Sequence, residues 1–279
     1  LRTFSKESIS GLEIDLIAAG APCPPFSKAG RQLGRKDERD LFPEVLRIVG
    51  ECRPRAVMLE NVRGLLDPVF DRYRATLDRK LAALGYQSKG WQLLNASDFG
   101  VPQLRPRAIC VAFRRDVGAS FSWPEPTGDA PTVGKALRRQ MAAAGWAGAA
   151  AWAKKADKIA PTLVGGSKKH GGPDLGPTRA KRAWAELGVN GHSVAADPPQ
   201  PNDTGMPRLT VGMAATLQGF PRNWTFAGRK TPAYRQVGNA FPPPVARAVG
   251  LAIRAALAEA DNGSHCAMQP ARARAAVRA

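Results

Sequence analysis

The sequence has 279 residues, of which 44% are hydrophobic and 23% are charged, a composition typical of a globular protein with an apolar core. This excludes a disordered or fibrous chain, and the length suffices for one large domain or two smaller ones. Lys and Arg number 41 against 23 Asp and Glu, which gives a net charge of +18. Such a charge predicts a polyanionic partner, most commonly nucleic acid, although an inert basic surface is the alternative.

Two further classes of protein are excluded. No apolar run approaches the roughly 20 residues of a membrane-spanning helix, and the first residues lack the apolar stretch of a secretory signal. The cysteines are widely spaced without a C-x-x-C pair, so they predict neither a zinc site nor a disulfide framework. We therefore expect a reducing, cytoplasmic compartment and no metal site. The cysteines are Cys23, Cys52, Cys110 and Cys266.

The first 120 residues alternate short apolar runs with helical patterns. An apolar run at 14–19 predicts a strand, a helix begins near Leu41, and a second strand follows at 56–61. Apolar residues at helical spacing then predict a helix that ends near Leu84. Two more strands are predicted at 86–96 and 108–113. Strands that alternate with helices are typical of an α/β fold with a parallel sheet.

The composition changes near Phe121. From there to about Thr204 the chain is rich in Gly, Pro, Ala and Lys with weak periodicity, which indicates a loop-rich basic segment suited to partner recognition. A helix that starts with prolines follows at its C-terminal side. We predict a catalytic domain at 1–120 plus 236–260, a recognition domain at 121–235 and a disordered basic tail at 261–279.

Cys23 lies in the turn Pro22-Cys23-Pro24-Pro25-Phe26-Ser27, directly after the first predicted strand. This is the edge of an α/β sheet where ligands bind. The prolines fix φ and stiffen the turn, which would hold the thiol in one direction. The alternative is a small buried apolar residue, as most free cysteines are.

Other polar residues stand at comparable positions. Glu60 ends the second predicted strand, on the same edge, where partial burial would keep a proton available; capping of the next helix is its alternative role. Asn61 is expected to order the turn. Gln103, Arg105 and Arg107 precede the last strand, and on an extended segment the two arginines would project to one face, suited to an anion or a base edge.

Taken together and in order, these segments resemble the DNA cytosine-5 methyltransferases. The resemblance runs from about Asp15 to Ala260 and is specific in combination. It implies an α/β, Rossmann-like catalytic domain that uses S-adenosylmethionine (SAM), with a smaller target-recognition domain that binds double-stranded DNA. The segments are PCPPFS, ENVRGL, PQLRPRAICVAF, RLTVGMAATLQGFPRNW and YRQVGNAFPPPVA.

The resemblance assigns catalytic roles. Cys23 would add to C6 of a flipped-out cytosine, so that C5 can attack the methyl group of SAM. Glu60 would hold or donate a proton at ring N3. Arg107 would contact the cytosine O2, and Arg105 would help to hold the catalytic loop and the base.

The same resemblance assigns binding roles. The cofactor-binding residues it implies are Pro22, Gly238, Asn239 and Ala240. Ser27 and the stretch KAGRQLGRKDER would close over the DNA, although a solvated basic face is the alternative for the latter. Residues of the basic segment would recognise the DNA sequence, although each could equally contact a phosphate and position the DNA without specifying a sequence. The DNA-binding candidates are Ser27, Gln103, Lys168, Lys169, His170, Arg179, Lys181 and Arg182.

The sequence also departs from the family pattern. The family's opening strand and Phe-x-Gly-x-Gly turn do not precede the resemblance, so we expect an N-terminally truncated fold without the first part of the cofactor site and with uncovered apolar faces. Pro24 stands where Gln is usual, and Gly212-Met213 stands where Arg-Glu is frequent. Gly212 would weaken a helix by about 1 kcal/mol.

Several alternatives stay open on these residues. A second chain could supply the missing segment, or the chain could be a DNA-binding fragment without catalysis. An RNA cytosine-5 methyltransferase is a third possibility, which the long basic segment from Phe121 to Thr204 disfavours. A compact chain without added reader domains is typical of bacterial restriction-modification enzymes. That implies a nucleoid-associated cytoplasmic protein with a cognate restriction endonuclease.

Overall fold

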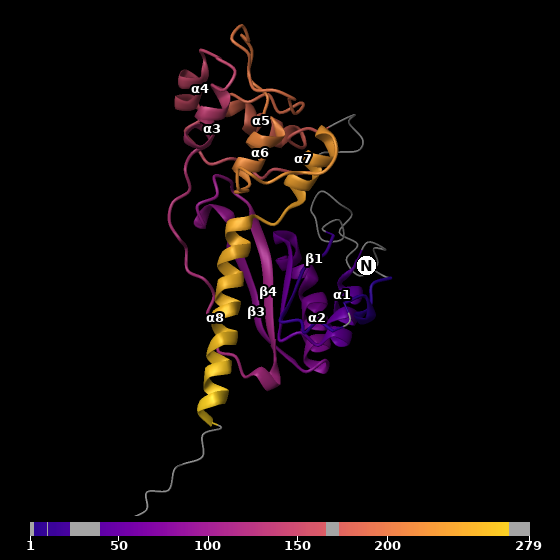
Figure 1. The fold of residues 1–279 in the computed structure, drawn as a ribbon. Helices are drawn as coiled ribbons and strands as arrows, with labels where there is room; N and C mark the ends of the chain where they lie inside the picture. Colours follow the sequence, from indigo (N-terminus) through magenta and orange to yellow (C-terminus); the bar gives the residue numbers. More distant parts are fainter. Residues whose placement is uncertain (1–2, 10, 23–39, 166–172, 268–279) are drawn as a thin grey trace, which may run out of the picture. The chain divides into compact units, whose positions relative to one another are not determined.

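The computed structural model describes residues 3–9, 11–22, 40–165 and 173–267, which fall into two compact units (Figure 1). Unit 1 comprises Leu1–Gln92, Ala108–Pro124 and Val249–Ala279, and unit 2 comprises Leu93–Arg107 and Glu125–Ala248. Each unit is described by itself below.

The sheet of unit 1 is built from the four predicted strands. These are β1 (Leu16–Gly20), β2 (Ala56–Val62), β3 (Tyr86–Asn95) and β4 (Pro106–Arg114). Their order across the sheet is β1-β2-β4-β3. Strands β1 and β2 are parallel, with pairs from Leu16 and Ala56 to Gly20 and Glu60. The two strands therefore end together at one edge of the sheet.

The other strand pairs are antiparallel, so the sheet is mixed and the prediction of a parallel sheet was wrong. The Arg114 N–H donates to Arg55 O at 3.0 Å, which places the end of β4 beside the start of β2. The Arg115 N–H donates to Gly85 O at 2.9 Å, which places the same end beside the start of β3. The physical reason is length: residues 96–105 are too few for the crossover of a dozen or more residues that a parallel pair needs.

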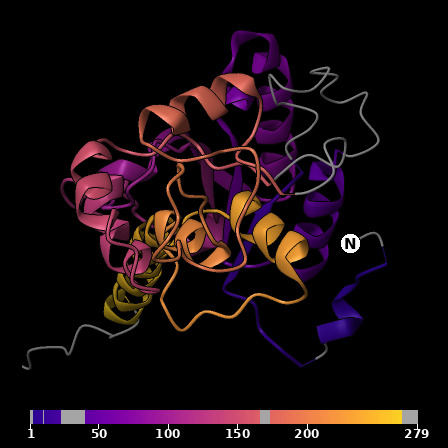
Figure 2. The ribbon, with the colours of Figure 1, turned by 90° about the horizontal axis from the view of Figure 1, so that it is seen from above.

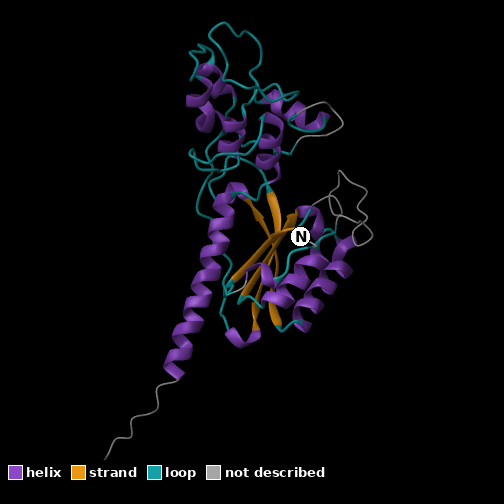
Figure 3. Ribbon diagram, turned by 45° about the vertical axis from the view of Figure 1, so that its right-hand side comes forward, coloured by secondary structure: helices purple, strands orange, loops and turns teal. Residues whose placement is uncertain are grey.

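Helices cover both faces of this sheet (Figures 1 and 3). Helix α1 (Phe42–Cys52) and helix α2 (Asp71–Ala83) lie on one face, and the part of α8 (Pro243–Ala267) that belongs to unit 1 lies on the other. The predicted apolar stripe of α1 is buried as Phe42, Val45, Leu46 and Val49. The apolar face of each helix thus packs toward the sheet, as helical spacing predicts.

Helix α8 extends further than predicted. It continues to Ala267, so the tail expected to be disordered from Asp261 begins as helix, while residues 268–279 lie outside the described part. Arg55 explains the extension, because its guanidinium donates to Leu257 O at 3.4 Å and pairs with Asp261. No helix among the described residues is long and apolar enough to cross a membrane.

Unit 2 is helical and loop-rich, as Figure 2 shows from above. Trp184, Leu137, Met213 and Tyr234 are fully or almost fully buried in one apolar cluster of this unit. Thr210 caps α6, since its hydroxyl accepts from the Met213 N–H at 3.2 Å, and the helix forms despite Gly212. The helices of the unit are α3 (Val133–Met141), α4 (Ala149–Lys155), α5 (Thr178–Glu186), α6 (Val211–Leu217) and α7 (Lys230–Asn239).

The units do not coincide with the predicted domains. Residues 93–107 and 236–248 were assigned to the catalytic domain, but both pack within unit 2. The reason is a network of hydrogen bonds that joins Gln103 and Arg105 to the end of α7. Short 3₁₀ turns complete the chain at Lys6–Ile9, Arg63–Leu66, Pro68–Phe70, Ala96–Asp98 and Arg115–Val117.

Strand β1 lies at the margin of the described sheet and lines an apolar groove of about 490 Å³. Residues Leu16 to Pro22 form one wall, and the other includes Leu41, Val45 and Ile48.

Candidate active site

At the sheet edge of unit 1, the carboxylate of Glu60 lies next to Gly20 of the neighbouring strand. Glu60 pairs with Gly20 in the parallel register and is only 8% exposed. A Cβ atom at Gly20 would lie 3.0 Å from Glu60 Oε2, so a larger residue in β1 would crowd the carboxylate. The glycine leaves room for Glu60 at the end of β2, where ligands of α/β sheets bind.

Asn61 ties the two strand ends together. Its side-chain amide is fully buried and donates to Ala21 O at 3.2 Å, while its Oδ1 accepts from the Val62 N–H at 2.9 Å. These contacts fit the predicted role of ordering the turn. They also hold the backbone two residues before Cys23. Cys23 and Ser27 lie outside the described residues, as do Lys168, Lys169 and His170.

In unit 2, Arg105 is buried and directed at backbone oxygens. It is 1% exposed, and its guanidinium donates to Leu163 O at 2.6 Å, Gly238 O at 2.7 Å and Ala240 O at 2.9 Å. Hydrogen bonds to a charged donor are roughly twice as strong as neutral ones. Arg105 therefore joins loop 160–165 to the end of α7. Its role in holding the catalytic loop and the base stays a prediction.

Gln103 and Gln218 extend this cluster. The Gln103 amide donates to Leu217 O at 3.0 Å and Gln218 Oε1 at 2.6 Å, and its Oε1 accepts from the Leu163 N–H at 2.8 Å. Gln218 in turn donates to Val237 O at 3.1 Å and Ala240 O at 2.8 Å. Both side chains are fully buried. The Gln103 side chain is thus hydrogen-bonded inside unit 2, and its contact with DNA stays a prediction.

Arg107 is placed differently from Arg105. It is 7% exposed, lies in β4, and donates to Pro106 O at 2.9 Å. Pro106, the first residue of β4, separates the two arginines. The two arginines were expected to project to one face, but Arg105 is taken up by backbone oxygens of unit 2.

The predicted cofactor residues end helix α7. A Cβ at Gly238 would lie 2.6 Å from Gly165 Cα and from its N, so these two backbones approach more closely than any side chain allows. A Cβ at Gly165 would overlap Asn239 Oδ1. Asn239 itself is exposed at the last residue of the helix. The two glycines thus hold the exposed Asn239 carboxamide beside loop 160–165.

The predicted basic readers on α5 fall into two classes. Arg179 and Arg182 are exposed, whereas Lys181 pairs with the buried carboxylate of Asp174 at 2.8 Å. Asp174 also accepts from the Gly176 N–H at 3.3 Å. Lys181 therefore stabilises the turn before α5, and the two arginines remain available to a ligand.

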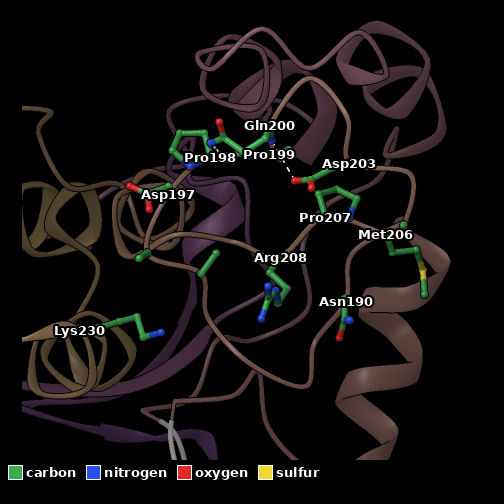
Figure 4. A pocket seen from close by; sticks show the side chains of 13 residues that line it. Asn190, Asp197, Pro198, Pro199, Gln200, Asp203, Met206, Pro207, Arg208 and Lys230 are labelled. Atoms are coloured by element: carbon green, nitrogen blue, oxygen red, sulfur yellow. Dashed lines mark hydrogen bonds between the residues drawn. The ribbon is translucent and has the colours of Figure 1, made fainter.

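A hollow of about 860 Å³ in unit 2 was not predicted (Figure 4). Its wall is the proline-rich loop 195–208, in which the Gln200 N–H donates to Asp203 Oδ2 at 2.8 Å. Arg208 and Lys230 supply positive charge, and Asp197 and Asp203 supply negative charge. The sequence did contain a signal for a basic surface here, because residues 204–236 include basic residues and no acidic residue. Spacing alone did not single out Arg208 or Lys230.

Of the two cysteines that the structure describes, Cys110 lacks the accessible, readily ionised thiol of a catalytic nucleophile. Cys110 is fully buried in β4, and desolvation raises the pKa of its thiol to about 12. Cys52 is partly exposed at the end of α1. A thiol with a raised pKa carries almost no thiolate at neutral pH, so Cys110 is structural. Among the described residues no cluster of His, Cys, Asp or Glu could hold a metal ion.

Comparison with known proteins agrees with this arrangement. The family described as C-5 cytosine-specific DNA methylase matches residues 1–255. The chain belongs to that family. The predicted family is thus confirmed.

Two relatives are type II methyltransferases. M.NaeI of Lentzea aerocolonigenes is 59% identical over 249 residues, which cover 88% of this chain and 60% of the relative. M.NgoMIV of Neisseria gonorrhoeae is 51% identical over 261 residues, 92% of this chain and 82% of the relative. The chain thus spans less than two thirds of the length of the first of these DNA methylases.

Solved structures share the fold at low identity. The methyltransferase EhMeth of Entamoeba histolytica has a TM-score of 0.59 at 13% identity, over 90% of this chain and 80% of that one. A mutant of Spodoptera frugiperda DNMT2 has a TM-score of 0.56 at 17% identity, over 91% and 83%. At these identities the likeness concerns the fold of the methylase alone.

Proposed function

We propose that the chain carries the methyl-transfer site of a restriction-modification enzyme that methylates C5 of cytosine in double-stranded DNA. The observation that carries this proposal is the sheet edge of unit 1. There Glu60 of β2 pairs with Gly20, the last residue of β1, and the Asn61 amide donates to the carbonyl oxygen of Ala21, two residues before Cys23 in the sequence. A carboxylate at this edge and a cysteine that follows β1 in the sequence are the two groups that the chemistry requires. The family and the type II relatives favour DNA over RNA and over a fragment without catalysis.

The proposed chemistry starts at Cys23. Cytosine C5 is a poor nucleophile, and addition of the Cys23 thiolate to C6 makes the ring an enamine whose C5 can form a new bond. Glu60 holds a proton at N3 and so offsets the charge that the addition creates. Arg107 donates to O2. After methyl transfer, loss of the C5 proton and release of sulfur restore the aromatic ring.

The target base must leave the duplex for this reaction. None of these groups reaches a base inside a stacked helix, and extrusion costs a few kcal/mol. Contacts between basic side chains and phosphates offset part of that free-energy cost. We propose that Ser27 and residues 28–39 contribute such contacts, with Lys168, Lys169, His170, Arg179 and Arg182 in unit 2.

SAM is the proposed cofactor, and it supplies the methyl group when bound. Two features fit it, each within its own unit. The apolar groove of unit 1 ends at Pro22 and suits an adenine ring. In unit 2, the exposed Asn239 carboxamide offers donors and an acceptor at a position that the Arg105 network holds rigid. Gly238 and Ala240 shape that turn rather than offering side chains.

Two further partners are proposed. The type II relatives suggest a cognate restriction endonuclease. A second chain that extends the sheet beside β1, which lies at the margin of the described sheet, is the other proposed partner. Co-purification of a smaller chain with the tagged protein from its own host would test the latter. A cytoplasmic, nucleoid-associated location follows from DNA as substrate.

The decisive experiment measures transfer of labelled methyl from SAM to plasmid DNA, together with duplex binding. Cys23→Ser should abolish transfer and leave DNA binding unchanged, since the hydroxyl is a far weaker nucleophile. Cys52→Ser is the matched control and should retain transfer. Full activity of Cys23→Ser would overturn the assignment. Separate titration of the protein with SAM, followed by calorimetry, would show whether Asn239→Ala weakens cofactor binding.

A further inference from the structure

We infer that helices α3 and α4 of unit 2 form a second DNA-contacting surface, which binds the phosphate backbone without reading sequence. This inference rests on the proposed DNA substrate. The surface, called here the α3–α4 basic face, consists of Lys135, Arg138, Arg139, Lys154, Lys155 and Lys158. None of these residues was a candidate on sequence grounds.

The two helices form one rigid piece. They lie side by side in Figures 1 and 2 and contact each other along their length. The Gly134 N–H donates to Ala156 O at 2.8 Å, and the Val133 N–H donates to Lys158 O at 2.9 Å. A Cβ at Gly134 would overlap Ala153 O, so only glycine permits this approach. The first amides of α3 are therefore used within the protein, and the basic side chains are what remains for a ligand.

The buried and exposed faces of the pair are sharply divided. Val133, Leu137 and Met141 of α3 and Trp152 and Ala156 at α4 are buried in the core of unit 2. All six residues of the α3–α4 basic face are exposed. Because the apolar stripe fixes how each helix is rotated, the charges are held outward on a defined surface.

These charges lack the partners that other basic residues have. Elsewhere Lys181 pairs with Asp174, Arg47 with Glu44 and Glu51, and Arg114 with Asp116. Within the described ranges, no carboxylate forms an ion pair with any of the six residues. A set of like charges without ion pairs is unfavourable by itself, and an anionic ligand lowers that cost.

Three of the six also share a hollow. Lys135 and Arg138 of α3 and Lys154 of α4 line a recess of about 580 Å³, with Asp157 as its acidic residue. The recess thus concentrates positive charge on a concave surface. Concave clusters of Arg and Lys suit phosphate oxygens, which accept several hydrogen bonds at once.

The composition of the surface favours nucleic acid over a protein partner. Protein interfaces bury a core of aromatic or aliphatic side chains. In the described part of the chain the exposed large apolar residues all lie outside 133–158. They are Leu12, Val69, Leu93, Leu104, Met206 and Trp224. An exposed basic face without apolar residues matches a phosphate backbone.

The test compares two triple variants that lose the same charge. The first removes the recess charges, with Lys135→Gln, Arg138→Gln and Lys154→Gln. The control removes three exposed charges of α2 in unit 1, with Arg72→Gln, Arg79→Gln and Lys80→Gln. Binding to two duplexes of unrelated sequence is measured by fluorescence anisotropy over a range of salt concentrations. Circular dichroism confirms that both variants fold.

Each phosphate contact contributes about 0.9 to the slope of log K against log salt. We expect the slope of the first variant to be smaller in magnitude than that of the wild type by about 2.7. When salt rises from about 50 to 200 mM, the fold-loss of affinity should therefore be roughly 40 times smaller for the variant than for the wild type. Both duplexes should be affected equally, and the control should keep the wild-type slope. Equal loss in both variants, which would reflect net charge, overturns the inference, as does an unchanged slope in the first variant. Failure of the wild type to bind any duplex would instead refute the proposed function, and this surface with it.

Discussion

Arg105 Nη2 lies 2.7 Å from the carbonyl oxygen of Gly238, although 133 positions separate the two residues in the sequence. The same nitrogen donates to Ala240 O, and Nη1 donates to Leu163 O. One buried guanidinium thus joins the segment before β4, loop 160–165 and the end of α7. The proposed cofactor residue Asn239 stands between the two carbonyl oxygens that Arg105 holds. Arg105 is therefore a positioning residue of unit 2.

Replacement of Arg105 should destabilise unit 2. Arg105→Gln removes three hydrogen bonds to buried carbonyl oxygens, and charged hydrogen bonds contribute about 1.5–3 kcal/mol each when measured singly. Because such losses are not additive, we expect a total near 3 kcal/mol in the free energy of unfolding. Urea unfolding followed by tryptophan fluorescence measures it, since Trp184 is buried in this unit. Arg179→Gln, on the exposed face of α5, should change it by less than about 0.5 kcal/mol. Equal stability of the two variants would contradict the role of Arg105.

Replacement of Gln218 should also lower the free energy of unfolding, by a smaller amount, because it too removes hydrogen bonds to buried partners. Gln218→Ala leaves the Val237 and Ala240 carbonyl oxygens and the Gln103 amide with fewer partners in a fully buried site. An unsatisfied buried group costs about 1–3 kcal/mol, so the unfolding midpoint should fall accordingly. Gln236→Ala is the control, because its exposed amide bonds only Ala227 O and Pro232 O. A Gln218 variant as stable as the Gln236 variant would rule out the network.

Two glycines should respond in opposite directions to alanine. Gly238→Ala places a methyl group against the backbone of Val164 and Gly165, which must move apart, so we expect a loss of about 1–3 kcal/mol. Gly250→Ala places its methyl group in open space within α8, and the lower entropy of the unfolded chain should add about 0.5–1 kcal/mol. Thermal unfolding of both variants checks the pair. A stabilised Gly238 variant would show that the two backbones do not meet.

The described thiols should differ in reactivity. Iodoacetamide should label Cys52 in the native protein at neutral pH and leave Cys110 unmodified, since Cys110 is both inaccessible and protonated. Peptide mass spectrometry after a timed quench measures the ratio. Labelling of Cys110 at the rate seen in urea would mean that β4 is not buried.

Cys110 should also make stability depend on alkaline pH. Below about pH 8.5 its thiol is protonated in both the folded and the unfolded chain, and its contribution is complete. Above that pH the unfolded chain loses the proton while the folded chain keeps it up to a pKa of about 12, so stability falls as the pH rises. The difference in urea midpoint between wild type and Cys110→Ala should therefore shift against the wild type between about pH 8 and pH 10. A constant difference would exclude the raised pKa.

Much of unit 1 could be predicted because its signals are local. All four strands lie where apolar runs predict them, and α1 buries the apolar stripe that its spacing predicts. The direction of β3 and β4 could not be predicted from periodicity, because a strand shows the same pattern in both orientations. The short link at 96–105 held the missing signal, since only an antiparallel pair can be joined so briefly.

The part of the site that could be predicted from sequence is the part where the residue type and its place after a buried strand point to chemistry. Glu60 and Asn61 stand at the sheet edge as expected, since the end of a buried strand places them there. Gln103 and Arg105 were predicted to contact DNA and the base, and the structure adds their hydrogen bonds to partners within unit 2. A polar side chain that binds DNA and one that binds buried carbonyl oxygens look alike in sequence, and only burial distinguishes them.

The sequence by itself determined the family and the strands of the sheet and predicted the roles of Cys23 and Glu60, because motifs and periodicity act over short stretches of chain. Only the tertiary structure decided the partners of Arg105, the pairing of Lys181 with Asp174 and the grouping of unpaired charges on α3 and α4. These depend on residues far apart in the chain, and their proximity is set by how apolar faces pack, which no local pattern encodes.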